Sequence, residues 1–296
     1  MRRFLKWVVG LVGVLVLAVA ALYAFAWHRS EQAMAKTYTV SDPPLTVKHD
    51  PETLARGAHL FATRGCADCH GADAGGKVVF DAGPVAKIVA PNITRGGHLM
   101  HLGPDQVAAA IRHGIRPDGH AMVFMPSGDF HEMSDEDTAA IVAHLQALPA
   151  SNNVPPPLEV RPLGRILYLF GKFPLLPGES LDHSPRARTA PPIAATPEYG
   201  KYLAQGCTGC HGENFGGQHV PGTPPEFPDS QNLTPANLGA WQEADFLRAI
   251  HEGTRPDGSK LDKFMPWETY AKMSDVELQA LWAYLRTLPP VQSKKK

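Results

Sequence analysis

The sequence predicts an all-α protein in which two tandem helical domains follow one N-terminal transmembrane helix. Three observations predict this. The chain begins with a basic flank and a long uncharged apolar run. Two segments of similar sequence follow, about 140 residues apart, which indicates a duplicated domain. Within each copy the apolar residues recur with the i, i+3, i+4 spacing of helices, and signals for strands are scarce.

The first element is the apolar run at the N-terminus. Residues 8–26 carry no charge, and Trp7 and Trp27 bracket them as interfacial aromatics do. A helix of about 19 residues is roughly 28 Å long, which matches the hydrocarbon core of a bilayer. The basic flank belongs in the cytoplasm. We therefore expect residues 1–30 to be an anchor in a bacterial inner membrane, with the rest of the chain in the periplasm. The alternative is a cleaved signal peptide, since residues 24–26 fit a cleavage site.

An internal repeat organises the rest of the chain. We place its two copies at residues 51–150 and 197–291, joined by a proline-rich connector at 151–196. We expect the connector to pack across one or both domains, and the alternative is a docking surface for a partner protein or the membrane. The matched segments are "CADCHG" at 66 with "CTGCHG" at 207, "FMP" at 124 with "FMP" at 264, and "MSDEDTAAIVAHLQALP" at 133 with "MSDVELQALWAYLRTLP" at 273.

Each copy is predicted to contain three helices separated by long loops. The first covers residues 53–62 in one copy and 198–204 in the other, just before the cysteines. The second helix ends at Gly114 and at Gly253, because glycine readily adopts the left-handed C-cap conformation. The last helix begins with a capping box, which pairs Ser134 with Asp137 and Ser274 with Glu277.

All four cysteines belong to two C-x-x-C-H motifs. Such a motif fits a redox dithiol, half of a zinc site, or the attachment point of a c-type haem. A dithiol needs a βαβ setting, which this sequence lacks, and one zinc site would have to draw its ligands from two separate repeats. Haem attachment explains every residue, because two thiols bond the vinyl groups and the next imidazole binds the iron. We therefore expect two covalently bound haem c groups.

A second axial ligand is expected from the repeated "FMP". Its methionines follow the motif histidines at nearly the same separation in both copies, and each precedes a proline. Methionine usually fills gaps in cores, but this matched separation predicts ligation. Met122 has no counterpart in the second copy. The predicted haem-binding residues are Cys66, Cys69, His70, Met125, Cys207, Cys210, His211 and Met265, and the predicted iron ligands among them are His70, Met125, His211 and Met265.

Further expectations concern the surroundings of the haem. The loop between His70 and Asn92 should offer a carbonyl to the ring N–H of His70, with Pro84 as one candidate. Arg116 and Arg255 either pair with haem propionates or face solvent in a turn. Asn92 and Asn232 are expected to brace loops. The histidines expected at the surface are His98, His101, His113, His120, His131, His219 and His251.

Together these motifs resemble class I c-type cytochrome domains. The combination of "NIT" or "NLT", "RPDG", "FMP" and the last helix is similar to the cytochrome c subunits of membrane-bound bacterial alcohol and related dehydrogenases. Those subunits usually carry three haem domains, whereas this chain carries two. The resemblance covers the two repeats and implies redox partner proteins: a dehydrogenase upstream, and a cytochrome or an oxidase downstream.

We therefore expect a membrane-anchored dihaem cytochrome c that relays single electrons in a periplasmic respiratory chain, from a dehydrogenase towards a terminal oxidase or a soluble cytochrome. Methionine ligation raises the reduction potential and fills the sixth coordination position, so no residue is expected to be catalytic. The alternative is a dihaem oxidoreductase, peroxidase-like or thiosulfate-oxidising, with one catalytic haem. A formal net charge of -1 and a pI near 6.9 give no support for nucleic-acid binding.

Overall fold

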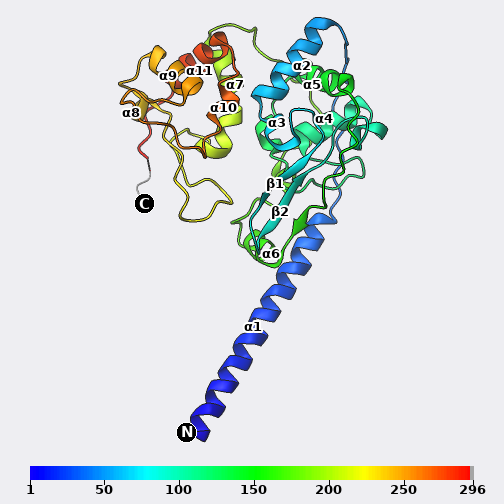
Figure 1. Ribbon diagram of the computed structural model, residues 1–296, viewed down its shortest axis with the longest axis vertical. Helices are drawn as coiled ribbons and strands as arrows, with labels where there is room; N and C mark the ends of the chain where they lie inside the picture. The colour runs from blue at the N-terminus through cyan, green and yellow to red at the C-terminus, as the bar shows by residue number, and fades with distance from the viewer. Residues whose placement is uncertain (294–296) are drawn as a thin grey trace.

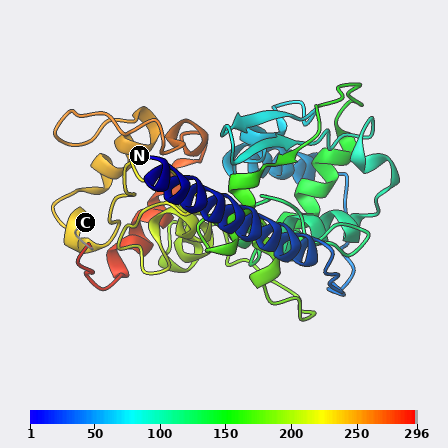
Figure 2. The same ribbon diagram turned by 90° about the horizontal axis from the view of Figure 1, so that it is seen from below.

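The computed structural model describes residues 1–293. A long N-terminal helix, α1 (Arg2–Met34), extends from a body made of two helical domains (Figure 1). Seen from below, α1 runs beneath that body (Figure 2). The side chains of its apolar run are exposed, and the helix is long and apolar enough to cross a membrane. A signal sequence near an N-terminus has the same properties.

The first domain is built around two long helices that pack against each other. Helix α2 begins after Asp50, whose side chain accepts a hydrogen bond from the amide of Thr53, and α5 begins after Ser134, which caps it in the same way. Helix α4 ends as predicted at Gly114, where φ is +63°. The helices of this domain are α2 (Pro51–Thr63), α3 (Cys66–His70), η1 (His98–His101), α4 (Pro104–His113), η2 (Ser127–Phe130) and α5 (Asp135–Ala147).

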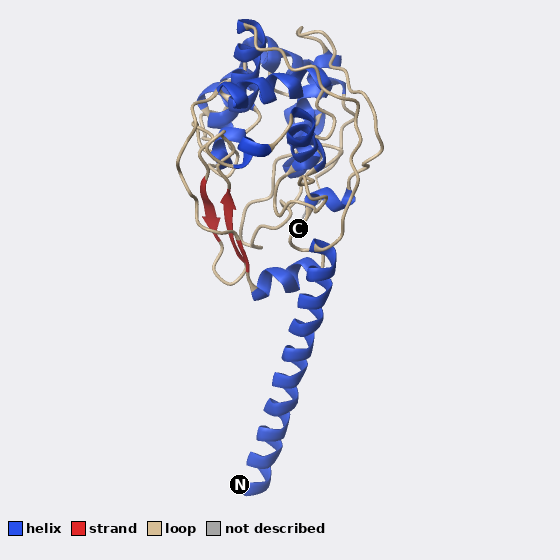
Figure 3. Cartoon of the chain, turned by 90° about the vertical axis from the view of Figure 1, so that its right-hand side faces the viewer, coloured by secondary structure: helices blue, strands red, loops and turns tan. Residues whose placement is uncertain are grey.

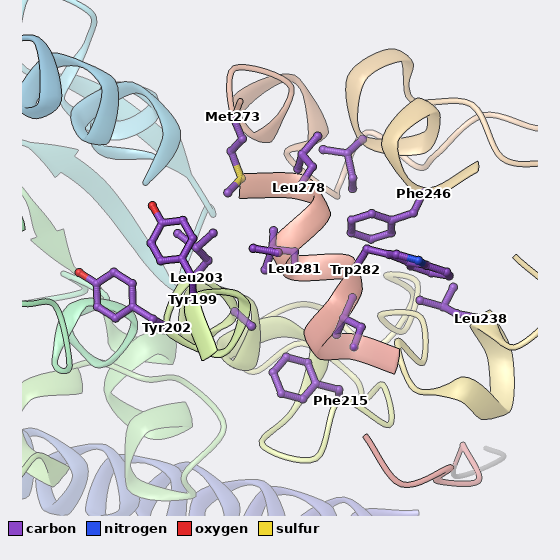
Figure 4. Close-up of a cluster of buried hydrophobic side chains, with 14 residues drawn as sticks. Tyr199, Tyr202, Leu203, Phe215, Leu238, Phe246, Met273, Leu278, Leu281 and Trp282 are labelled. Atoms are coloured by element: carbon purple, nitrogen blue, oxygen red, sulfur yellow. The ribbon is translucent and has the colours of Figure 1, made fainter. Parts of the chain in front are cut away.

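The second domain repeats this arrangement. Figure 4 shows its core, in which Leu203 of the first helix packs with Leu281 and Trp282 of the last, beside Phe246. The predicted capping box is complete here, because Ser274 and Glu277 each accept a hydrogen bond from the other's backbone amide. The helices of this domain are α7 (Pro197–His211), α8 (Pro235–Leu238), α9 (Glu243–Glu252), α10 (Trp267–Tyr270) and α11 (Asp275–Thr287).

A glycine marks the same close crossing of the long helices in both domains. A Cβ atom at Gly57 would lie 1.9 Å from the carbonyl oxygen of Ala140, and one at Gly200 would lie 1.9 Å from that of Ala280. Between this glycine and the cysteine motif, the first domain has two more residues than the second. In the first domain α2 therefore ends before the motif, Gly65 adopts a φ of +77°, and a separate helix, α3, carries the motif. In the second domain α7 continues through its motif without a break.

A small antiparallel sheet interrupts the helical pattern of the first domain. Strands β1 (Lys77–Asp81) and β2 (Ala86–Ala90) form a hairpin, and β3 (Glu159–Val160) of the connector pairs with β2. The sequence did not predict these strands, because they are short and one comes from outside the repeat. In the second domain the corresponding residues, 212–231, are all described and contain no strand. The all-α class is confirmed, with the sheet as a local addition.

The connector packs against the first domain, which agrees with the expectation that it packs across one or both domains. Phe173, Leu175 and Leu176 are buried in a cluster with Ile88 and Ile115. The connector also forms α6 (Pro162–Leu169) and η3 (Pro177–Ser180), and α6 lies beside the end of α1 (Figure 3).

Two histidines expected at the surface are buried instead. His113 lies 2.9 Å from a carboxylate oxygen of Asp42 and 3.0 Å from the ring of His183, while His131 bonds the carbonyl of Arg112 at 3.0 Å. The expectation was wrong for these two histidines because two distant segments cover the C-terminal end of α4. One is the segment before the first domain, which contains Asp42, and the other is the connector, which contains His183. The pKa of His113 is lowered by its burial, although Asp42 opposes this effect.

Candidate haem sites

The motif histidine is held in the same way in both domains. The Nδ1 atom of His70 is 3.0 Å from the carbonyl oxygen of Pro91, and Nδ1 of His211 is 2.7 Å from that of Gln231. A carbonyl only accepts hydrogen bonds, so Nδ1 carries the proton and Nε2 keeps its lone pair. Each imidazole is therefore oriented and in the tautomer that a metal ion requires.

The source of this carbonyl corrects one expectation. It comes from the predicted loop, but from Pro91 and not from Pro84. The carbonyl of Pro84 instead accepts a hydrogen bond from the amide of Leu163 in the connector, at 3.1 Å. Pro84 lies in the turn of the β1–β2 hairpin, where the chain is drawn towards α6 and away from His70.

The two asparagines expected to brace loops do so immediately after these carbonyls. The side chain of Asn92 accepts a hydrogen bond from the amide of Thr94 (2.9 Å) and donates one to the carbonyl of Ser151 (2.7 Å). Asn232 repeats the pattern with the amide of Thr234 (2.8 Å) and the carbonyl of Val291 (2.6 Å). The loop that orients each histidine is thus tied to the segment that follows the last helix of its domain.

The first cysteine of each motif lies in apolar surroundings, whereas Cys210 is exposed. Cys66 and Cys207 each contact the hydrophobic core of their own domain, and burial raises the pKa of both thiols to about 12. Burial also raises the pKa of Cys69 and Cys210. Reactive redox cysteines require the opposite shift, towards the thiolate. Within residues 1–293 no group of three or more His, Cys, Asp or Glu side chains could hold a metal ion, so the two motifs do not assemble a shared zinc site.

The two predicted methionine ligands occupy equivalent places. Met125 packs against the core that Cys66 also contacts, and Met265 packs against the core that Cys207 contacts. Each carbonyl accepts a hydrogen bond at 2.8 Å from the amide two residues later, so the turn is the same in both domains. The structure thus places a thioether against the same core as the first cysteine of the motif in each domain. Ligation by these methionines remains a prediction.

These residues fit a c-type haem in each domain. Two thiols and an imidazole share one helical turn, the imidazole is oriented by a carbonyl, and a half-buried thioether lies against the same core. A glycine follows each histidine and ends the helix. Gly71 has a φ of +83° and Gly212 a φ of +80°, a backbone conformation that residues with a Cβ atom rarely adopt.

The arginines of the two repeated "RPDG" turns favour the solvent-facing alternative. The guanidinium of Arg116 is half exposed and lies 3.3 Å from Asp118 in the same turn. That of Arg255 bonds Ser259 and the carbonyl of Lys260, again within its own turn. Both arginines therefore stabilise the turn in which they occur.

The two domains meet in an interface with approximate two-fold symmetry. His59 of α2 bonds Glu277 of α11 at 2.8 Å, and Tyr202 of α7 bonds Asp137 of α5 at 2.7 Å. These pairs are equivalent, because His59 and Tyr202 each lie two positions after the crossing glycine of their own domain. Tyr199 and Tyr202 carry their hydroxyls on the side of the core that faces the first domain (Figure 4).

One further pair lies where the symmetry axis must pass. Arg56 and Tyr199 are themselves equivalent positions, each directly before a crossing glycine, and they bond each other at 3.3 Å. The sequence repeat carried a signal for this interface. When α2 and α7 are aligned on Gly57 and Gly200, and not on their cysteines, Arg56 aligns with Tyr199 and His59 aligns with Tyr202.

The same interface brings the two cysteine motifs towards the other domain. Asp68, inside the first motif, accepts a hydrogen bond of 2.6 Å from Thr269, four residues after Met265. Gly209, inside the second motif, lies against Asp129, four residues after Met125; an added Cβ would be 2.9 Å from its carboxylate. Each motif thus contacts the segment that follows the methionine of the other domain. Single-sequence reasoning missed this arrangement.

Comparison with known proteins agrees with this geometry. The family model described as "Cytochrome c" matches residues 54–149 and again 197–289, which together make up more than half of the chain. The "Alcohol dehydrogenase (quinone), cytochrome c subunit" of Gluconacetobacter polyoxogenes is 30% identical over 142 residues, which cover 45% of this chain and 29% of that protein. The "Gluconate 2-dehydrogenase cytochrome c subunit" of Pantoea cypripedii is 34% identical over 107 residues, covering 33% of this chain and 24% of that subunit.

A third relative is the "Fructose dehydrogenase cytochrome subunit" of Gluconobacter japonicus, 32% identical over 98 residues, or 30% of this chain and 20% of that subunit. The chain therefore spans less than a third of the length of these three relatives. The predicted resemblance to cytochrome c subunits of dehydrogenases is confirmed.

Proposed function

This chain belongs to the cytochrome c family, and on that premise we propose that it is a membrane-anchored dihaem cytochrome that relays single electrons on the periplasmic side of a bacterial inner membrane. The observation that carries the proposal is the pair of C-x-x-C-H motifs whose histidines are both oriented by a loop carbonyl. Each domain would hold one haem c. Cys66, Cys69, Cys207 and Cys210 would tether the haems, and His70, Met125, His211 and Met265 would bind the irons.

Bound haem c supplies an iron that cycles between the ferrous and ferric states and so carries one electron. The protein's residues define its surroundings. The two thiols fix its position on one helical turn, and the carbonyl of Pro91 or Gln231 fixes the ring of the histidine. The core around Cys66 and Cys207 excludes water, which favours a raised reduction potential.

The interface between the domains supports electron transfer from one haem to the other. The contacts of Asp68 with Thr269 and of Gly209 with Asp129 hold both attachment turns at this interface. Electron transfer between cofactors depends steeply on distance, so a fixed separation gives a fixed rate. The hydrogen bonds of His59 with Glu277 and of Tyr202 with Asp137, together with the ion pair of Arg56 and Glu277 at 3.5 Å, hold the two domains in one relative orientation.

The proposed donor is a dehydrogenase, and the proposed acceptor is a terminal oxidase or a soluble cytochrome. The relatives named as cytochrome subunits of alcohol, gluconate and fructose dehydrogenases support the donor. Helix α1 supports attachment to the membrane. The alternative, an oxidoreductase with one catalytic haem, needs an open position on one iron. The equivalent placement of Met125 and Met265 favours the relay.

The test uses the full chain, produced with the cell's haem-maturation machinery and purified from membranes. We expect two haems per chain that stay attached after denaturation, low-spin spectra for both, and no binding of carbon monoxide to the reduced protein. Haem that is absent, removable by denaturants, or present at one per chain would overturn the proposal. Carbon monoxide binding to one reduced haem would favour the oxidoreductase. Recovery of the intact N-terminus in the membrane fraction distinguishes an anchor from a cleaved signal peptide.

A further inference from the structure

We propose that α6 and the residues directly after it form a second membrane contact, lying in the headgroup region of the bilayer beside the point where α1 leaves it. The ligand is a phospholipid surface with some anionic lipid. This inference rests on the proposed function only in taking α1 as the membrane anchor, and the experiment below separates the two.

Helix α6 is clamped to α1 at the level of the membrane interface. The guanidinium of Arg165 lies 3.7 Å from the ring centre of Trp27, bonds the hydroxyl of Ser30 at 2.6 Å, and pairs with Glu31 at 2.8 Å. Arg165 is buried, as is Ser30. Trp27 ends the uncharged run of α1, and tryptophan at this position marks the boundary between hydrocarbon and headgroups. The clamp therefore fixes α6 at the height of that boundary.

The other side of α6 is held by the β1–β2 hairpin. The carbonyl of Val85 accepts a hydrogen bond of 3.0 Å from the amide of Arg161, and the carbonyl of Pro84 accepts one of 3.1 Å from the amide of Leu163. A Cβ at Gly164 would lie 2.2 Å from the carbonyl oxygen of Val85, so the backbones are in direct contact. The position of α6 is thus set by protein contacts on two sides.

The remaining face of α6 is apolar and uncovered. Leu163 is 38% exposed and Phe170 is 60% exposed, while Ile166 between them is partly exposed. These residues follow the i, i+3, i+7 spacing of one helix face. Exposed leucine and phenylalanine beside a membrane helix are typical of helices that lie in the bilayer interface.

Basic side chains lie near α6. Arg29 and Lys36 line a groove of about 790 Å³ between α1, the end of α6 and the connector residues that follow it, and the same groove contains Glu179, which accepts a hydrogen bond from the Tyr168 hydroxyl. Lys172, two residues after Phe170, is exposed. Basic residues near a membrane are attracted to anionic lipid headgroups, and the lipid phosphates lie at this height. Helix α6 also packs against α1, whose exposed apolar side chains have lipid as their matching environment.

The test exploits the cysteine count. In the dihaem protein all four cysteines would be bonded to haem, so one added cysteine is the only free thiol. We would attach a nitroxide to Phe170→Cys, Val16→Cys and Val276→Cys in separate full-length proteins. Each would be reconstituted into vesicles of phosphatidylcholine and phosphatidylglycerol. The accessibility of the nitroxide to oxygen, relative to a water-soluble nickel chelate, rises with depth in the bilayer. Val16 reports on α1. Val276 lies in the first turn of α11, a helix at the end of the body opposite α1 (Figure 1).

We expect a relative oxygen accessibility at position 170 several-fold above that at position 276 and below that at position 16. A value at 170 equal to that at 276, with position 16 deep in lipid, would overturn the second contact and leave the anchor intact. Water-like values at both 16 and 170 would overturn the anchor itself. Protection at 170 in native membranes but not in vesicles would show that a partner protein covers α6, and would overturn the lipid proposal.

A second label tests the apolar face directly. A nitroxide at Leu163→Cys should show a relative oxygen accessibility several-fold above that at Val276→Cys, because Leu163 and Phe170 lie on the same face of α6 and α6 is held at a fixed height. A water-like value at position 163, with position 16 deep in lipid, would contradict the proposal. Retained low-spin spectra would show that the labelled protein is folded.

Discussion

At the scale of single residues, each candidate haem site depends on one hydrogen bond. A carbonyl at Pro91 or Gln231 decides which nitrogen of the histidine carries the proton, and an asparagine next to that carbonyl fixes the loop. The sequence predicted the cysteines, the histidines and the bracing asparagines, because each has a fixed place in a repeated motif. It could not identify the carbonyl, since every residue of the loop carries one.

Replacing each of the two proposed methionine ligands tests the axial assignment. Met125→Ala should convert one of the two haems to the high-spin state and lower its reduction potential, and Met265→Ala should do the same to the other, because the thioether stabilises ferrous iron. Absorption spectra and a redox titration measure both effects. Met122→Ala is the control, since Met122 has no equivalent in the second domain, and it should leave both haems low-spin. Unchanged spectra in the Met125 and Met265 variants would show that the assignment is wrong.

Removing a bracing amide should destabilise the first domain. Asn92→Ala leaves the carbonyl of Ser151 and the amide of Thr94 without their buried partner, and each unsatisfied group costs about 1–3 kcal/mol. We expect the free energy of unfolding, measured with denaturant on the haem-loaded protein, to fall by about 2–4 kcal/mol. Asn152→Ala is the control, because Asn152 is exposed, and it should change stability by less than about 0.5 kcal/mol. Equal stability of the two variants would contradict the bracing role.

At the scale of elements, helix ends were predictable and the hairpin was not. Gly114, Gly253, Ser134 and Ser274 end or begin helices where local chemistry requires it. The β1–β2 hairpin depends instead on a partner strand from the connector, and no local pattern encodes that pairing. The burial of His113 has the same cause, since the covering residues are distant in sequence.

The helix crossing in each domain makes a strong prediction. Gly57→Ala and Gly200→Ala should each destabilise their domain by about 3 kcal/mol, because the new methyl group meets a backbone carbonyl that cannot rotate away. Gly206→Ala in α7 is the matched control. No atom lies within 4 Å of its added Cβ, so it should be neutral or stabilising by up to about 1 kcal/mol. Denaturant unfolding measures all three, and a Gly200→Ala protein as stable as Gly206→Ala would contradict the close crossing.

At the scale of the whole molecule, the interface between the domains makes stability depend on pH. Burial alone would raise the pKa of Glu277, but hydrogen bonds from His59 and Ser274 outweigh it and hold the pKa at about 2. This is below the ordinary value of 4.5, so Glu277 stabilises the fold fully above about pH 4.5. That contribution is lost as the pH falls towards about 2.

Glu277→Gln should therefore lower the free energy of unfolding at pH 7. Its stability should also fall less steeply than that of the native chain as the pH drops from about 4.5 to about 2. Denaturant titrations at a series of pH values measure both effects. Glu136→Gln, at an exposed position in the first turn of α5, is the control and should follow the native pH dependence. Identical slopes for Glu277→Gln and the native chain would rule out this role of Glu277.

The pair on the symmetry axis also determines which domains can associate. If the first domains of two chains met through this surface, Arg56 would face Arg56, and two positive charges would be forced together. If two second domains met, two Tyr199 hydroxyls would face each other, and no arginine would pair with the two Glu277 carboxylates. Only the unlike pairing sets a guanidinium against a phenol and a carboxylate. A duplicated domain could in principle cross-link chains into dimers and longer chains. Here the mismatch at one position disfavours pairing between like domains and leaves only the pairing of a first domain with a second domain.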